Sequence, residues 1–269
     1  MRTLIKTGFG LLMLAFVLIG ASYSVLRAQG VSGTVHAAGR MQTTETRKLG
    51  KGIESVELSG PIDMTLRQGA VASLVVRGEQ RLLGNIDTTQ EGGTLHIGTT
   101  GMLFHHRSPL QVELVLPSLA HLEVSGSGDS NINGFSGDKM DVQVHGSGNV
   151  IFNGRYKDIS AGVHGSGELE LNGGNSDKVA VELVGPGQMT VVGSCKDFKA
   201  RQSGSGDLDA QHLTAENAAI DQHGSGTTSV QAKHSAEVTM RGSGDVNVYG
   251  NPSEHSVNRS GSGEVNWKR

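Results

Sequence analysis

The sequence predicts an all-β protein whose larger part is a parallel β-helix (β-solenoid). Three observations carry this prediction. A glycine-rich tripeptide recurs at a nearly constant interval, the residues on either side of it alternate between apolar and polar, and the interval is too short to hold a helix as well. A constant interval of about twenty residues is typical of repeat architectures, in which each unit stacks on its neighbours.

The repeated tripeptide is Gly-Ser-Gly, replaced once by Gly185-Pro186-Gly187. Its first glycines, 18 to 20 residues apart, are Gly126, Gly146, Gly165, Gly185, Gly204, Gly224, Gly242 and Gly261. Glycine adopts turn conformations cheaply and allows backbones to approach closely, so we expect the tripeptide to form one bend of each coil. Pro186 fits there because a bend need not donate a hydrogen bond to the strand ladder.

The residues around each tripeptide alternate with period two, as Val142 and Val144 do before one tripeptide and Val150 and Phe152 do after it. This pattern predicts strands with one buried face. About twenty residues hold two short strands and their turns but no crossover helix. We therefore expect roughly eight coils of 19–20 residues, each strand pairing with its equivalent in the next coil, in a rod roughly 35–40 Å long.

One position, four residues before each tripeptide, should form a column in the core. Its residues are Val142, Ala161, Val181, Ala200, Ile220, Val238 and Val257. Gln202 and Gln222 share the inward parity in neighbouring coils, which predicts a ladder of amides hydrogen-bonded along the stack.

Taken in order, the chain divides into four parts. Residues 1–27 place Arg2 and Lys6 before an apolar run, which predicts a signal peptide or an N-terminal membrane anchor with the rest of the chain outside the cytoplasm. Residues 28–48 are polar and aperiodic and are expected to be a linker. Residues 49–124 have strand patterns without a regular period, with a helical turn over 81–86, and are expected to be an irregular β capping region. Residues 125–269 are the repeat.

The last six residues, 264–269, supply only half a coil. Trp267 falls in the column that holds Val248 one coil earlier, so we expect it to cover the last core layer. Lys268 and Arg269 place charge at the open strand edge, which discourages pairing with other chains. The sequence therefore predicts a monomer.

Three segments carry a resemblance to a known family. They are 56–69 (VELSGPIDMTLRQG), 93–97 (GTLHI) and 116–129, where LPSL leads into VSGSGD. In this order they resemble the auto-transporter adhesin head GIN domain family, over nearly all of residues 50–269. The resemblance implies a bacterial exported β-helical domain. The family name implies adhesion, but its function is unknown, so no catalytic or binding residue is carried over.

Composition excludes several classes of function. The net charge is −3 and no Lys/Arg cluster stands out, which argues against nucleic-acid binding. Cys195 is the only cysteine, so there is no disulfide framework or thiolate metal site, and in a predicted turn it is expected to be incidental. No third glycine completes a dinucleotide-binding motif after any tripeptide. We therefore expect no cofactor and name no catalytic residue.

Two groups of side chains remain as candidates for metal ions. Glu168 with Glu170, and Asp207 with Asp209, concentrate carboxylates that either bind a cation or form a solvated face. The residue after each tripeptide alternates between acidic and neutral until the last pair, which keeps like charges apart. His145 and His164 should lie on adjacent rungs, where they either bind a transition metal or form a polar ladder, and the pair at 105–106 lies in a polar loop.

The sequence thus predicts an exported, non-enzymatic binding, adhesion-like or scaffold module of the bacterial cell envelope or periplasm. Its partner would be a glycan or an envelope protein, with membrane contact only through the N-terminal segment. The alternative is a polysaccharide-processing enzyme, because parallel β-helices often carry lyase or hydrolase sites. Such a site needs converging carboxylates and residues that hold sugars, and aromatic residues make up only 4% of the chain.

Overall fold

The computed structural model describes residues 41–100 and 109–268. The predicted signal peptide or anchor at 1–27 and the histidine pair at 105–106 lie outside the described residues. Among the described residues, no helix is long and apolar enough to span a membrane. The structural unit that holds the repeat is Gln42–Arg269.

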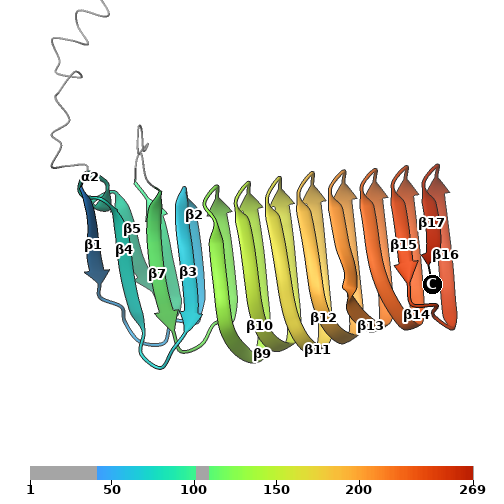
Figure 1. Ribbon diagram of the computed structural model, residues 1–269, viewed down its shortest axis with the longest axis horizontal. Coiled ribbons are helices and arrows are strands. Elements are labelled where there is room, and N and C mark those ends of the chain that lie inside the picture. The colour runs from blue at the N-terminus through green and yellow to red at the C-terminus, as the bar shows by residue number, and fades with distance from the viewer. Residues whose placement is uncertain (1–40, 101–108, 269) are drawn as a thin grey trace, which may run out of the picture. The chain divides into compact units, whose positions relative to one another are not determined.

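The repeat forms a parallel β-solenoid (Figure 1). Six long strands each trace almost a whole coil. They are β9 (Ser130–Gly146), β10 (Asn149–Gly165), β11 (Glu168–Gly185), β12 (Gln188–Gly204), β13 (Asp207–Gly224) and β14 (Thr227–Gly242). The shorter β15 (Asp245–Tyr249), β16 (Glu254–Gly261) and β17 (Glu264–Lys268) complete the stack.

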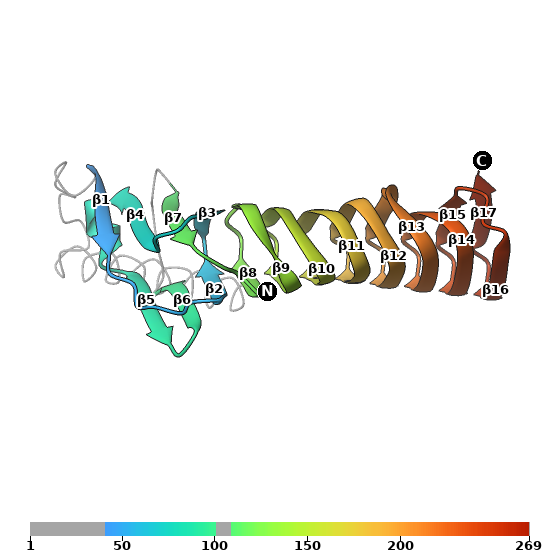
Figure 2. The same ribbon diagram turned by 90° about the horizontal axis from the view of Figure 1, so that it is seen from below.

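Each coil has two faces. The first face is formed by the residues that follow a tripeptide, and the second face by those that precede the next one; Figure 2 shows the two layers side by side. Between the faces the chain rounds a wide corner opposite the tripeptide bends. Each strand pairs in parallel with its equivalent in the next coil, as β10 does with β9 and β11. The predicted fold class is confirmed.

The tripeptide bends stack backbone on backbone along one edge of the unit (Figure 1). The carbonyl of Gly146 accepts hydrogen bonds from the N–H groups of Ser166 and Gly167, both at 2.9 Å. Where proline removes the middle N–H, Gly187 alone donates to Gly165, at 2.9 Å. The first glycine has a left-handed φ in most coils, for example 130° at Gly165. A side chain there would meet the preceding coil, which explains why the tripeptide recurs.

The predicted core column is confirmed. In register, Ala161 lies between Val142 and Val181, and the remaining members follow one per coil. All of them are buried except Val257, which is 44% exposed. Val257 is exposed because β16 pairs with β14 and, among the described residues, with no strand on its other side.

The buried amides of Gln202 and Gln222 are in register but do not form the predicted ladder with each other. Each Nε2 instead donates to a carbonyl four residues ahead, Gln202 to Gly206 and Gln222 to Gly226, the latter at 2.5 Å. These side chains tie the second face to the tripeptide bend. The Oε1 of Gln202 accepts a hydrogen bond from the Thr228 hydroxyl, so this amide is bonded by other partners than Gln222.

The first coil of the stack lies before the repeat begins. It consists of β2 (Ser55–Gly60) and β3 (Ile62–Gln68), joined at Gly60-Pro61. These strands pair in parallel with β8 (His121–Gly126) and β9 on one side. On the other side they pair in parallel with β6 (Thr94–Thr99) and β7 (Leu110–Leu116).

Antiparallel strands end the parallel stack, as expected for an irregular cap. They are β5 (Ile86–Glu91) on β6, β4 (Ser73–Glu79) on β7, and β1 (Gln42–Arg47) on β4. The helical turn α2 (Gln80–Leu83) follows β4, close to the predicted position. The Arg47 guanidinium donates to the carbonyls of Leu83 and Ile86, at 3.1 and 3.4 Å. This side chain ties β1 to the turn and to the start of β5.

Strand β1 lies within residues 28–48, where the sequence predicts a linker. Its residues, QTTETR, are almost all exposed. An edge strand with no buried face has no apolar alternation, so the pattern contained no signal for it.

The opposite end of the unit is held by an aromatic contact. Trp267 lies in register with Val248, as predicted, and its ring centroid is 4.8 Å from that of His255. Trp267 is still 40% exposed, so it covers the last core layer only in part.

Deleting residues 267–269 is expected to convert a monomer into dimers or filaments, because it uncovers the last apolar layer beside two unpaired strand edges. Size-exclusion chromatography with light scattering would detect the change. The matched control removes only 268–269, which keeps Trp267 and should leave a monomer. A truncated protein that stays monomeric and equally stable would show that Trp267 is not the cap.

Candidate functional site

The aspartates that follow tripeptides bind the next coil. Asp129 Oδ1 accepts from the N–H of Asn149 at 3.3 Å, and Asp207 Oδ1 accepts from the N–H of Thr227 at 3.0 Å. Where the position is not aspartate, a backbone carbonyl takes over, as Gly148 does for the N–H of Glu168 at 3.2 Å. The recurring Gly-Ser-Gly-Asp motif was the sequence signal for these hydrogen bonds between coils. Reasoning from charge alone did not predict them.

The four candidate acids are not brought together. Gln188 lies between Glu168 and Asp207 in register. Thr190 likewise lies between Glu170 and Asp209. Among the described residues there is no group of three or more His, Cys, Asp or Glu side chains arranged to hold a metal ion.

His145 and His164 stack on adjacent rungs, as predicted. Their ring centroids are 5.0 Å apart and the ring planes are inclined by 12°. The nitrogen lone pairs lie in these nearly parallel planes, so they do not converge on one point. A zinc ion would need both nitrogens at about 2.0–2.1 Å. The two rings thus form a stacked pair on the second face.

Cys195 lies in β12 with its side chain in the core, and not in the turn that the sequence predicts. Burial, and to a lesser degree the charge of Asp197, raises the pKa of the Cys195 thiol to about 12. The thiol is therefore protonated at neutral pH and is a poor nucleophile or metal ligand.

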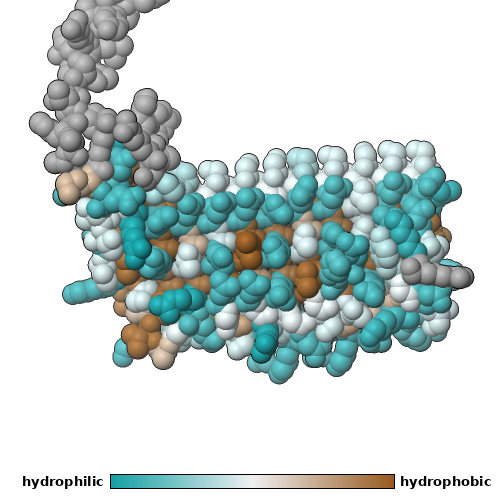
Figure 3. Space-filling view, viewed as in Figure 1, coloured by the Kyte–Doolittle hydropathy of each residue, from teal (hydrophilic) through white to brown (hydrophobic). Residues whose placement is uncertain are grey.

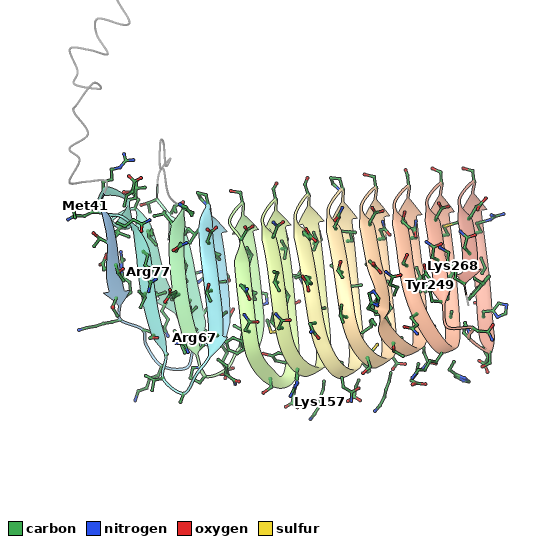
Figure 4. The ribbon with its side chains drawn as sticks, in the orientation of Figure 1. Met41, Arg67, Arg77, Lys157, Tyr249 and Lys268 are labelled. Atoms are coloured by element: carbon green, nitrogen blue, oxygen red, sulfur yellow. The ribbon has the colours of Figure 1, made fainter. Side chains whose placement is uncertain are left out.

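The corner opposite the tripeptides carries charges of alternating sign in successive coils. Ion pairs join Asp138 to Lys157 and Asp177 to Lys196, both at 2.7 Å. Hydrogen bonding to these lysines lowers the pKa of Asp138 and of Asp177. Figure 4 shows Lys157 at the outer edge of the corner. Exposed pairs of this kind add little stability, but they favour the observed register because a shifted coil would bring like charges together.

A hollow of about 520 Å³ lies where the first face meets this corner. We call it the corner groove. It is lined by Gly134, Asn153, Gly154, Arg155, Asn172 and Gly174, among others. Its walls offer two amides, one guanidinium, the hydroxyl of Ser136 and exposed backbone. These groups bind hydroxyls and anions.

The corner groove arises where the strands fall out of step. The pairing of β9 with β10 shifts near Asn153, and that of β11 with β12 shifts near Asn172. Glycines occupy these irregular positions, with φ of 89° at Gly134 and 67° at Gly174. Such β-bulges bend the strands locally and re-aim side chains.

The family profile described as "Putative auto-transporter adhesin, head GIN domain" matches residues 53–252. The chain belongs to the head GIN domain family. A comparison with functionally curated proteins gives no match.

Solved structures of bacterial proteins share this head GIN fold. A "putative adhesin" from Parabacteroides distasonis superposes with a TM-score of 0.78 at 20% identity, covering 86% of this chain and 98% of its own. A "putative adhesin" from Parabacteroides merdae gives 0.77 at 16%, covering 85% and 96%. A "putative lipid binding protein" from Parabacteroides distasonis gives 0.75 at 23%, covering 85% and 97%. At these identities the likeness establishes the fold alone.

Proposed function

We propose that this head GIN domain protein is an exported binding module of the bacterial cell envelope, without enzymatic activity, that holds an extended partner such as a glycan chain or an envelope protein. The family name, with its reference to adhesins, suggests an exported or envelope protein. The apolar segment after Arg2 and Lys6 supports export to the periplasm or retention at the membrane.

The observation that carries the proposal is the regular outer surface of the solenoid. Polar side chains run in rows along the rod on the face seen in Figure 3, with small hydrophobic areas between them. Neighbouring members of a row are one rung apart, roughly 4.8 Å. A rigid, periodic polar surface suits a partner that is itself extended and repeating, because many weak contacts then add along its length.

The alternative of a polysaccharide-processing enzyme has less support. Glycoside hydrolysis by the common route needs two carboxylates about 5 to 10 Å apart that face one sugar bond. Asp207 is hydrogen-bonded to the backbone of the next coil, and Asp209 accepts two hydrogen bonds from Gln211, both at 3.0 Å. These carboxylates are occupied in structural bonds on a solvent-facing row.

The proposal is tested with the purified full-length protein and an insoluble glycan fraction from envelope extract. We expect the native protein to co-sediment with that fraction, or with envelope proteins in a parallel pull-down, and the heat-denatured protein to lose this binding. Cell fractionation should also recover the protein outside the cytoplasm. Failure to bind either fraction, or full-length protein in the cytosol, would contradict the proposal. Release of new reducing ends from the glycan would favour the enzyme.

A further inference from the structure

The corner groove differs from the rest of the corner in its charge balance. The neighbouring lysines of the corner each face a carboxylate, as Lys157 faces Asp138. Arg155 is exposed and, among the described residues, forms no ion pair or hydrogen bond. Arg67, which Figure 4 places towards the same corner, is in register with Asn133 and also has no ion pair within the described part of the chain. Arg155 therefore brings to the groove a positive charge that no acid of the described residues pairs with.

The position of Arg155 is set by the neighbouring coil. A Cβ added to Gly174 would lie 3.3 Å from Arg155 Cγ. The aliphatic stem of Arg155 thus passes close to the bare backbone at Gly174, and both residues line the groove. A side chain at residue 174 would displace that stem, and the φ of 67° there is one that glycine adopts at little cost.

The amides of Asn153 and Asn172 also line the groove. Asn133, Asn153 and Asn172 lie in register on three successive coils. Asn153 Nδ2 donates to Asn133 Oδ1 at 2.9 Å, which fixes the orientation of that amide. Among the described residues, Asn153 Oδ1 and Asn172 Nδ2 have no hydrogen-bond partner. The groove therefore presents an acceptor and donors that are already oriented, and sugar hydroxyls use both kinds of group.

We infer that the corner groove binds an acidic sugar unit of an envelope glycan. The guanidinium of Arg155 would pair with the sugar carboxylate, and the amides of Asn153 and Asn172 would bind its hydroxyls. A guanidinium donates two parallel hydrogen bonds to a carboxylate, a geometry that a lysine does not offer. The inference rests on the proposed function and deepens it, because it names the ligand chemistry and the residues that recognise it.

The probe is an oligogalacturonate of fixed length, titrated into the purified full-length protein by isothermal titration calorimetry. Its methyl ester is the control ligand, since it keeps the sugar rings but removes the charge. We expect the acid to bind at least about tenfold more tightly than the ester, and less tightly as salt is raised. Equal affinity for the two ligands, or no binding of the acid, would overturn the inference.

Two substitutions locate the site. Arg155→Ala is expected to weaken binding of the acid by about tenfold or more. Lys157→Ala removes the same charge two residues away, at a side chain already paired with Asp138, and should change affinity by less than about twofold. Matching thermal unfolding curves would show that both variants are folded. If Arg155→Ala binds like the unmodified protein, the groove is not the site. If that variant still binds the envelope fraction, the proposed function stands and only the inference about the groove is wrong.

Discussion

Replacing Val181 with aspartate is expected to unfold the central coils of the solenoid. Val181 is 4% exposed and is stacked between Ala161 and Ala200. A carboxylate buried at this position would have no partner, so we expect the free energy of unfolding to fall by about 4 kcal/mol or more. Because each coil packs only on its neighbours, the damage should begin locally and spread along the stack. Urea unfolding followed by circular dichroism would measure it.

The adjacent residue provides the matched control. Glu182 points outward on the second face and, among the described residues, pairs only with Arg201, at 3.8 Å. Glu182→Ala should change the free energy of unfolding by no more than about 0.5 kcal/mol. If the two variants lost equal stability, or if Val181→Asp unfolded like the unmodified protein, the assignment of inner and outer faces would be wrong.

The repeat could be predicted from sequence because its information is local. Period-two alternation decides which side chains face the core, and the regular tripeptide fixes which residues stack. The positions of Val142 and Ala161 within their own repeats were therefore enough to predict that they are neighbours.

The N-terminal cap could not be derived in the same way. Pairings such as β1 with β4 join segments separated in sequence, with no repeat to indicate the register. The polar sequence of β1 also lacks the alternation that reveals strands. Composition and strand pattern indicated that residues 49–124 close the stack, but not which strands do so or that they turn antiparallel.

The candidate site depended on irregularities that a repeat pattern hides. Reasoning from residue type selected acids and histidines, which are the usual ligands of metal ions. The structure assigns Asp129 and Asp207 to hydrogen bonds between coils, and stacks the rings of His145 and His164. The corner groove forms where extra residues break the register, so its amides and Arg155 come together only in the folded chain.

The second large effect is expected at the tripeptide bend. Gly165 has φ of 130°, and a Cβ there would lie 2.6 Å from the carbonyl oxygen of Gly146. Gly165→Ala would force that contact apart and strain the backbone, so we expect the free energy of unfolding to fall by about 2 to 4 kcal/mol.

The control is Ser166→Ala: the Ser166 side chain is exposed, and alanine keeps the N–H that bonds to Gly146. It should unfold within about 0.5 kcal/mol of the unmodified protein. Equal stability of the two variants in urea titrations would mean that the close stacking of glycine backbones is not what holds the coils at this spacing.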